Sequence, residues 1–415
     1  MSILADLRSL TPKQRSAVTA SYLGWTLDAF DFFIMVFVLK DIAAEFQTPI
    51  SAVTEGLFIT LALRPVGALI FGLAADRFGR RPTLMVDVLL YSIVEFASGF
   101  APSLMVLLIL RGLYGIAMGG EWGVGASLAM ETIPAKTRGV ISGMLQAGYP
   151  TGYLLAAVAN KFLFDEIGWR GMFMVGALPA LLVLYIRRQV DESPAFAARQ
   201  HDVKKVRLGP ILQRHKALLI YAVLLMTAFN SFSHGTQDLY PTFLKVQLQF
   251  DTSTISNIAI IYNIGAIIGG IAFGALSQYI GRRKAIVLAA LLALPVIPLW
   301  AFSSTPLLLA IGAFFMQVAV QGAWGVIPVH LNELSPDEIR GTFPGVVYQL
   351  GNLLASKNQV LQAQFAEAHN NDYASIMAWT IAGVAIIIAV LTYVGGESHS
   401  VTFGVVVSKP PPATG

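Results

Sequence analysis

Long apolar runs constrain this sequence more than any other feature. A helix needs about 20 apolar residues to cross the hydrocarbon core of a bilayer, and twelve runs of about that length are present. Charged residues make up only 13% of the 415 residues, whereas soluble domains carry about 25%. We therefore predict an all-α integral membrane protein in contact with the lipid bilayer. The runs cover residues 17–39, 52–75, 83–100, 103–130, 139–160, 171–187, 216–246, 254–278, 285–302, 305–331, 341–365 and 373–394.

The basic residues predict which loops face the cytoplasm. Cytoplasmic loops of membrane proteins carry an excess of Lys and Arg. The odd-numbered loops contain only Lys40, Lys161, Arg170 and Lys245, whereas the other basic residues outside the runs lie in the even-numbered loops and the terminal segments. We expect a multi-pass protein of the plasma membrane, the bacterial inner membrane, with both termini in the cytoplasm. The net charge of +4 is then a matter of topology and does not indicate nucleic-acid binding.

Several function classes are excluded by what the sequence does not contain. The chain has no cysteine, which rules out disulfides, thiolate metal sites and cysteine nucleophiles. It has no Walker loop, no zinc-ligand spacing and no G-x-S-x-G elbow, the usual signs of ATPases, zinc enzymes and hydrolases. We expect that the protein is not an enzyme and holds neither a cofactor nor a metal.

The chain carries an internal duplication. The loop segment 72–82 recurs at 274–284, and the segment 131–139 recurs at 333–341, both at an offset of 202 residues. Such a repeat indicates two six-helix halves, the plan of transporters built from parallel repeats. We predict an N-terminal half at residues 1–187, a cytoplasmic linker at 188–215 and a C-terminal half at 216–415.

The repeated loops contain residues that can hold the two halves together. Asp76 and Arg80 lie in the first loop, and Glu131 and Arg138 in the second; Gln278 replaces the acid in the recurring copy of the first loop. A carboxylate such as Asp76 can lie against a helix N-terminus or pair with an arginine of the other half. We predict that these four charged residues form a conformational latch, with simple topological anchoring as the alternative.

These loops also carry a family resemblance. The segment Gly72-L-A-A-Asp76-R-F-G-R-R resembles the loop motif of the major facilitator superfamily, and Arg111-G-L-Y-G resembles its fourth-helix motif. The resemblance implies a fold of twelve transmembrane helices in two pseudo-symmetric halves. It also implies that Arg111 takes part in proton release from a nearby acid, here Asp31 or Glu121.

A polar stripe interrupts the seventh apolar run. Asn230, His234 and Asp238 are spaced i, i+4 and i+8, which places them on one face of a helix. Facing lipid would cost several kcal/mol, so we expect them to line a cavity. A histidine beside a carboxylate can exchange a proton near neutral pH. We predict substrate binding by Asn230 and His234 and proton coupling by His234 and Asp238, with a structural cluster as the alternative.

The same stretch resembles a narrower branch of the superfamily. The pattern Asn230-x-x-Ser233-His234-x-Thr236-Gln237-Asp238-x-x-x-Thr242 is similar to the signature of lactate–pyruvate:proton symporters, in the sialate:proton symporter branch. It implies a monomeric secondary transporter that carries a short monocarboxylate with a proton by alternating access. Sialic acid, another sugar acid or an aromatic acid is the alternative substrate. A non-transporting receptor and a channel are the remaining alternatives.

Further ionisable groups lie at membrane depth in the N-terminal half. Asp28 and Asp31 share one face of the first run, and Arg111 and Glu121 lie in the fourth. We expect these four to be candidates for proton coupling, with structural carboxylates, bonded to backbone or paired with an arginine, as the alternative for Asp28 and Asp31. Arg64 lies about 18 Å along its helix from the first repeated loop. Its planar guanidinium fits a carboxylate in a bidentate pair, so we predict that it binds the substrate, with a permanent Arg–Asp pair as the alternative.

Neutral polar groups complete the expected substrate site. Gln349 and Asn352 lie at i and i+3 in the eleventh run, and amides bind hydroxyl or carboxylate groups without requiring a balancing charge. The pair is similar to substrate residues of lactate-transporting relatives. Tyr149 lies at the centre of the fifth run, the symmetry mate of the eleventh, and we add it to the predicted site. We expect structural roles for Asp87, Glu95, His330 and Lys357, with coupling as the alternative for Lys357.

Overall fold

The computed structural model describes residues 3–199, 208–397, 399 and 401–403, and all regular structure in these residues is helical. The prediction of an all-α membrane protein with twelve spans in two six-helix halves is confirmed. By length and composition alone, seven helices within the described residues can each cross a membrane, or eight if one bent pair counts as a single span. The other spans join shorter helices or, like α4, carry several charged residues.

The N-terminal half supplies the first six spans. The spans are formed by α2 (Pro12–Glu45), α3 (Ile50–Phe78), α4 (Arg80–Ser98), α5 (Leu104–Thr132), α6 (Arg138–Gln146) with α7 (Gly148–Val175), and α8 (Ala180–Gln189). Helix α7 is kinked at Gly168, where the backbone is not helical. The fifth span therefore ends before Gly168, and the sixth runs from the last part of α7 into α8.

The C-terminal half supplies the other six spans. They are formed by α11 (Lys216–Gln237) with α12 (Tyr240–Thr242) and the π-helical turn η2 (Phe243–Gln247), α13 (Thr252–Ile280), α14 (Arg282–Ala301), α15 (Pro306–Leu334), α16 (Phe343–Ala355) with α17 (Asn358–Ala368), and α18 (Tyr373–Val394). The short helices α1 (Ile3–Arg8), η1 (Ala135–Thr137), α9 (Pro194–Arg199), α10 (Leu208–Arg214) and η3 (Asp337–Ile339) lie outside the spans.

The duplication extends to backbone conformation. Gly79 (φ 109°) and Gly281 (φ 93°) are 202 residues apart, and each makes the tight turn into α4 or α14. This left-handed region is open to glycine and disfavoured for other residues. Gln47 (φ 50°) and Gln249 (φ 56°) form a second such pair, just before α3 and α13. The two halves thus repeat even their unusual turns.

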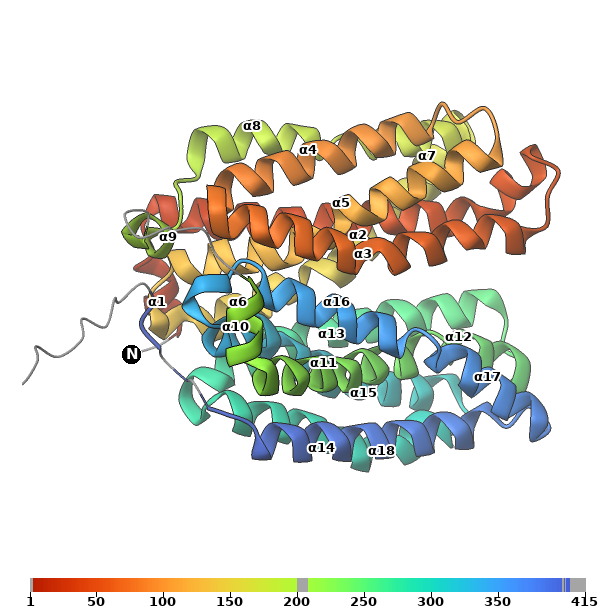
Figure 1. Ribbon diagram of the computed structural model, residues 1–415. Coiled ribbons are helices and arrows are strands. Elements are labelled where there is room, and N and C mark those ends of the chain that lie inside the picture. Colours follow the sequence, from red (N-terminus) through yellow and green to blue (C-terminus); the bar gives the residue numbers. More distant parts are fainter. Residues whose placement is uncertain (1–2, 200–207, 398, 400, 404–415) are drawn as a thin grey trace, which may run out of the picture.

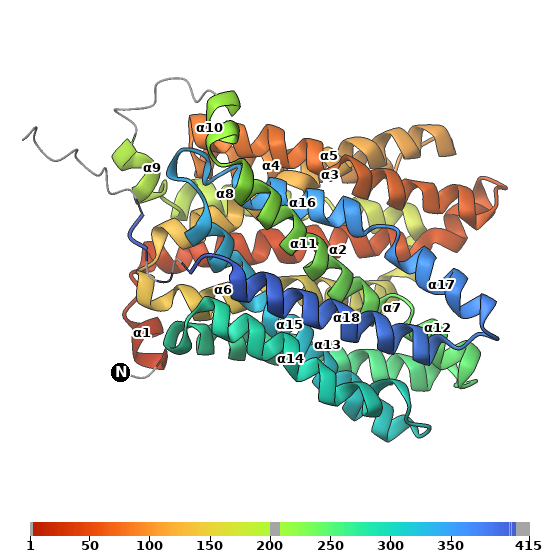
Figure 2. The same cartoon turned by 60° about the horizontal axis from the view of Figure 1, so that its bottom comes forward.

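The halves pack on each other through two symmetry-related helices. Figure 1 shows the N-terminal half above the C-terminal half, with α6 and α16 between them. Helix α6 packs against α13 and α15 of the other half, and α16 packs against α3 and α5. Figures 1 and 2 place α1, α9 and α10 at one end of the bundle and α12 and α17 at the other. We call the first end the basic end, since the arginine-rich repeated loops meet there.

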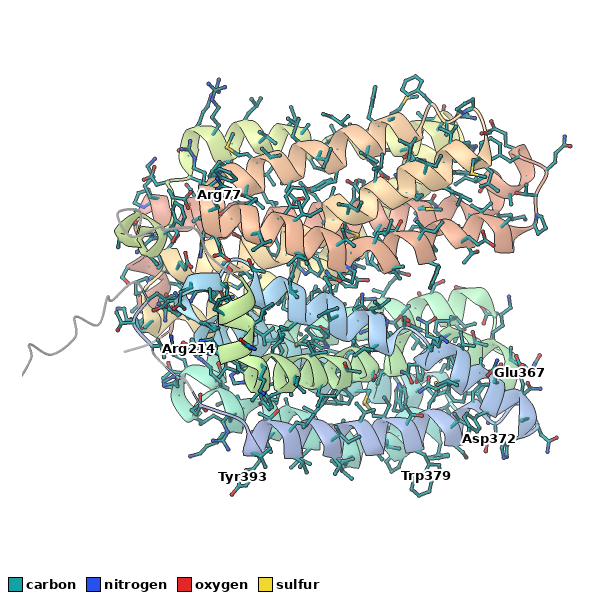
Figure 3. The ribbon with its side chains drawn as sticks, viewed as in Figure 1. Arg77, Arg214, Glu367, Asp372, Trp379 and Tyr393 are labelled. Atoms are coloured by element: carbon teal, nitrogen blue, oxygen red, sulfur yellow. The ribbon has the colours of Figure 1, made fainter. Side chains whose placement is uncertain are left out.

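The outer surface fits a lipid environment. Trp379 and Tyr393 lie near opposite ends of α18, and their side chains are 78% and 72% exposed. Figure 3 shows both pointing away from the bundle, whereas Arg77 and Arg214 mark the basic end and Glu367 and Asp372 the opposite end. Aromatic side chains of this kind favour the two membrane–water interfaces.

Hydrogen bonds between the halves close the basic end. Asp76 accepts bonds from the backbone nitrogens of Gly341 (2.8 Å) and Thr342 (2.9 Å) and from the Thr342 hydroxyl (2.7 Å). These donors lie just before α16, so the carboxylate caps the start of that helix. Gln278, the repeat mate of Asp76 in sequence, accepts one bond from the Gly139 nitrogen at the start of α6 (3.1 Å). The same contact is therefore made twice, and it is stronger on the Asp76 side.

The other predicted latch residues divide between two roles. Arg80 pairs with Asp76 (3.1 Å) and Glu131 (2.9 Å), all within the N-terminal half. Arg138 lies 3.8 Å from Glu333 of the C-terminal half. Asp76 and Arg138 therefore reach the other half directly, whereas Arg80 and Glu131 support the loop from which Asp76 extends.

A C-terminal segment also spans the two halves. Arg138 donates a hydrogen bond to the carbonyl of Val401 (2.6 Å). The ring of Phe403 lies between two guanidiniums, 3.6 Å from that of Arg138 and 4.1 Å from that of Arg340. Arg138 and Arg340 are repeat mates from different halves, so one aromatic ring contacts both halves at the basic end.

Removing the Asp76 carboxylate should open the basic end. Asp76→Ala deletes three bonds to the other half, and a hydrogen bond to a charged group contributes about 1.5–3 kcal/mol. Gln278→Ala deletes one bond to the other half, the one from Gly139, together with two bonds from Arg282 within its own half, and serves as the matched control. Because the chain lacks cysteine, spin labels at Arg77→Cys and Glu338→Cys can report the distance across this end. We expect longer label-to-label distances in Asp76→Ala than in Gln278→Ala. The same distance distribution in both variants and in the labelled protein with Asp76 and Gln278 intact would contradict this.

Candidate functional site

A cavity of about 370 Å³ lies between the two halves. Its walls come from α2, α3, α6 and α7 on one side and from α11, α12, α13, α15, α16 and α17 on the other. Aromatic rings form much of the wall nearest the basic end. Trp25 stacks on Tyr149 (centroids 5.5 Å apart), and Tyr348 contacts Trp122 (4.7 Å) and Trp324 (5.5 Å).

The polar stripe of α11 lines this cavity. His234 Nδ1 lies 2.9 Å from Asp238 Oδ2, and His234 Nε2 lies 3.1 Å from Asn352 Oδ1. Both ring nitrogens thus face oxygen atoms, and an imidazolium can donate to both, whereas a neutral ring can donate to only one. Gln359 donates a further bond to Asp238. The structure therefore brings together α11, α16 and α17 around one histidine–carboxylate pair.

Arg64 lines the cavity from the N-terminal half. Its nearest charged partner is Asp28, at 3.7 Å between Arg64 Nη2 and Asp28 Oδ2, which is longer than a hydrogen bond. Arg64 Nε and Nη2 have no hydrogen-bond partner among the described residues. These two nitrogens are themselves buried, but the Arg64 residue lines the cavity, and a guanidinium without a hydrogen-bonded counter-ion beside a cavity can attract an anion.

Five of the six predicted substrate residues line the cavity: Arg64, Tyr149, Asn230, His234 and Asn352. Asn230 also donates to the Met226 carbonyl of its own helix (2.8 Å). Gln349 does not line the cavity; it is 1% exposed, and its amide has no partner among the residues that the structure describes. Residues three apart on a helix differ by about 60° in direction, which is enough to turn Gln349 away while Asn352 faces inward.

The other predicted proton-coupling residues, apart from His234 and Asp238, lie outside the cavity wall. Asp28, Asp31 and Glu121 are fully buried within the N-terminal half. Arg111 bonds to Glu95 (2.5 Å) and to Ser98 (2.6 Å) rather than to Asp31 or Glu121. Glu95, which the sequence indicated only as structural, is therefore the direct partner of Arg111.

Several cavity residues were not predicted from the sequence. Gln359 lies beyond the break between α16 and α17, so its direction could not be read from helical periodicity. Gln321 lies one turn from Gln317 on α15, a polar i, i+4 pair that could have been noticed; Gln317 accepts from Gln237 (2.9 Å), and Gln321 donates to Ser233 (3.4 Å). Lys357, at the start of α17, is exposed and does not line the cavity.

The fold and the sequence together define the class of protein. The family described as "Sugar (and other) transporter" matches residues 17–209 and 216–400, and the chain belongs to this family of major facilitator transporters. The structure of the proton:xylose symporter XylE bound to 6-bromo-6-deoxy-D-glucose superposes with a TM-score of 0.76 at 19% identity, covering 94% of this chain and 98% of that one. At this identity the likeness concerns the fold. The protein is a membrane transporter and not an enzyme.

Three similar proteins carry names of transporters for a carboxylic acid, sialic acid or a lactone. A "Carboxylic acid transporter protein homolog" of Saccharomyces cerevisiae is 28% identical over 95% of this chain and 70% of its own length. The sialic acid transporter NanX of Escherichia coli is 29% identical over 83% of this chain and 85% of its own length. A "Probable 4-methylmuconolactone transporter" of Cupriavidus pinatubonensis is 30% identical over 84% of this chain and 83% of its own length.

Thiol labelling should separate the two amide positions of α16. We expect Asn352→Cys to react with a membrane-impermeant thiol reagent, because its side chain lines the cavity, and Gln349→Cys to be protected, because it does not. The chain has no native cysteine, so intact-mass spectrometry reads each site without background. Equal labelling of both variants in the folded protein would contradict an orientation of α16 in which Asn352 faces the cavity and Gln349 faces away from it.

Proposed function

We propose that this protein is a proton-coupled symporter of short monocarboxylates, such as lactate and pyruvate, in the sialate:proton symporter branch. The observation that carries the proposal is the opposition of two charged groups across one cavity. Arg64 lines the cavity from the N-terminal half with a guanidinium that has no hydrogen-bonded counter-ion among the described residues, and the His234–Asp238 pair lies on the C-terminal wall. The names of two similar proteins, a carboxylic acid transporter homolog and a sialic acid transporter, support an acid as the substrate, although other relatives are named proline/betaine transporters.

In this proposal Arg64 binds the substrate carboxylate. Its planar fork matches a carboxylate, and the low dielectric of the surrounding helices strengthens the attraction. Asn352 and Tyr149 lie on opposite walls, where they can bond the hydroxyl or keto oxygen of the substrate. The anion and the guanidinium then neutralise each other, which lowers the cost of moving a charge through the dry core.

The His234–Asp238 pair carries the coupled proton. Protonation adds positive charge to the cavity and favours the arrival of an anion. Because linkage is reciprocal, the bound anion also holds the proton more tightly. Substrate and proton therefore load together.

The closed basic end gives the direction of access. The positive-inside rule assigns this end to the cytoplasm, so in the proposed cycle this conformation can exchange substrate only with the outside. Transport requires the bonds of Asp76 and Arg138 to break while the opposite end closes. The two halves of one chain enclose the whole cavity, and the functional unit is a monomer.

A second substrate class is favoured by the cavity walls. Trp25, Tyr149, Tyr153 and Tyr348 line a space of about 370 Å³, and aromatic walls pack well against rings. A sugar acid or an aromatic acid would use these rings, whereas lactate would leave much of the space to water. The sialic acid and 4-methylmuconolactone relatives make this the main rival.

Uptake into proteoliposomes tests the proposal. Labelled lactate, pyruvate and sialic acid are supplied outside, with and without an inward proton gradient. We expect the gradient to drive accumulation of lactate and pyruvate above equilibrium. Accumulation of sialic acid alone would favour the rival substrate class, and gradient-independent equilibration would contradict symport.

Arg64→Lys should weaken lactate binding at least tenfold while the protein stays folded. Lysine keeps the charge but loses the two parallel donors, and a tenfold loss corresponds to about 1.4 kcal/mol. Calorimetry of L-lactate binding measures the change, and thermal unfolding checks the fold. If Arg64→Lys binds L-lactate with wild-type affinity, the substrate carboxylate does not bind Arg64.

Asp238→Asn should abolish gradient-driven accumulation but keep lactate counterflow, because counterflow needs binding and the conformational change but no net proton movement. His234→Ala should shift the pH dependence of uptake. In the unaltered protein uptake should fall as pH rises, since the pair loses its proton. If Asp238→Asn keeps full accumulation with unchanged pH dependence, the pair is structural.

A further inference from the structure

The interior of the N-terminal half contains more buried acids than its arginines can balance. Each of the five carboxyl side chains is 0% exposed, and they come from α2, α4 and α5. Two guanidiniums share this interior, those of Arg64 and Arg111. An unpaired carboxylate in such surroundings is very costly, and it takes a proton instead. The acids are Asp28, Asp31, Asp87, Glu95 and Glu121.

Most of this cluster has no means of holding a negative charge. Arg111 is committed to Glu95 and Ser98. The carboxyl oxygens of Asp31, Asp87 and Glu121 have no hydrogen-bond partner in the described part of the chain. The neighbouring tyrosines do not compensate, because the Tyr114 hydroxyl donates to the backbone carbonyl of Asp28 (3.2 Å) and the Tyr91 hydroxyl has no partner there.

Asp28 differs from the other four acids because, among the described residues, it alone has a carboxyl oxygen within 4 Å of the Arg64 guanidinium. The two groups lie 3.7 Å apart without a hydrogen bond. Asp28 is shut off from the cavity, whereas Arg64 lines it; among the described members of the cluster, Arg64 alone does so. The Arg64 guanidinium thus lies between the buried Asp28 carboxyl group on one side and the cavity on the other.

We propose that Asp28 is a second proton-binding site, controlled by the substrate through Arg64. This inference rests on the proposed function. When a substrate carboxylate binds Arg64, it competes with Asp28 for the one positive charge. The Asp28 carboxylate then loses its counter-ion and takes up a proton from solvent to become a neutral acid. Substrate binding in the N-terminal half would by itself draw a proton into the protein, independently of His234 and Asp238.

Infrared spectroscopy tests the switch without any substrate. Arg64→Gln removes the guanidinium, as a competing anion would, and should produce a new carboxylic-acid carbonyl band. Arg64→Lys is the matched control, because it keeps the charge and should show no new band. The double variant Arg64→Gln with Asp28→Asn should lose the band. Folded Arg64→Gln protein without a new band, or a band that persists in the double variant, would overturn the inference.

Proton counting during L-lactate binding gives a second test that does not need Arg64→Gln to fold. Calorimetry in buffers of different ionisation enthalpy measures the protons taken up per lactate bound. We expect Asp28→Asn to bind lactate with about one proton fewer than wild type, whereas Asp238→Asn retains the uptake that depends on Asp28. An Asp28→Asn variant with the wild-type count would overturn the inference and leave symport through His234 and Asp238 intact. If wild type does not bind lactate, the proposed substrate fails, and the infrared result still decides the role of Asp28.

Discussion

The cost of an uncompensated charge in a medium without water organises this protein. At membrane depth an ionised side chain must be paired, protonated or placed against a cavity. Arg111 meets the requirement by pairing with Glu95, and His234 and Asp238 meet it by pairing within the cavity wall. Arg64 meets it only loosely, at 3.7 Å from Asp28. Because the charge of Arg64 is incompletely compensated without substrate, Arg64 is the group to which an anionic substrate can most readily bind.

The same requirement explains how the basic end closes. Backbone groups at helix starts need partners, and the two halves provide them for each other through Asp76 and Gln278. Both contacts come from matching positions of the repeat, and the difference between Asp76 and Gln278 makes them unequal. A latch with one strong and one weak side can open without both sides yielding at the same moment, which lowers the barrier to separation while the closed state keeps its charged cap.

The spans could be predicted from the sequence because hydropathy and the distribution of Lys and Arg determine membrane insertion and orientation, and both are local properties of the sequence. It also predicted that Asn230, His234 and Asp238 share a face, since helical periodicity gives that much. It did not predict the contact between His234 and Asn352, because residues 118 positions apart meet only through packing. The helix breaks were missed as well: α11 ends before Pro241, which cannot donate a backbone bond, so the span continues through α12 and a π-helical turn. The pairing of Arg111 with Glu95 was equally invisible, since several acids were within reach along the chain.

The contacts of Phe403, at the end of the described chain, depend on whether the basic end of the transporter is closed or open. Its ring contacts one guanidinium from each half, and those guanidiniums can both be near it only while the basic end is closed. In the proposed cycle, separation of the halves leaves the ring with one arginine at most and weakens the hold on the Val401 carbonyl. In this cycle, whether residues 401–403 are bound at the basic end reports the conformation of the transporter. They are bound while substrate can enter from outside, and they are released each time the cavity opens toward the cytoplasm.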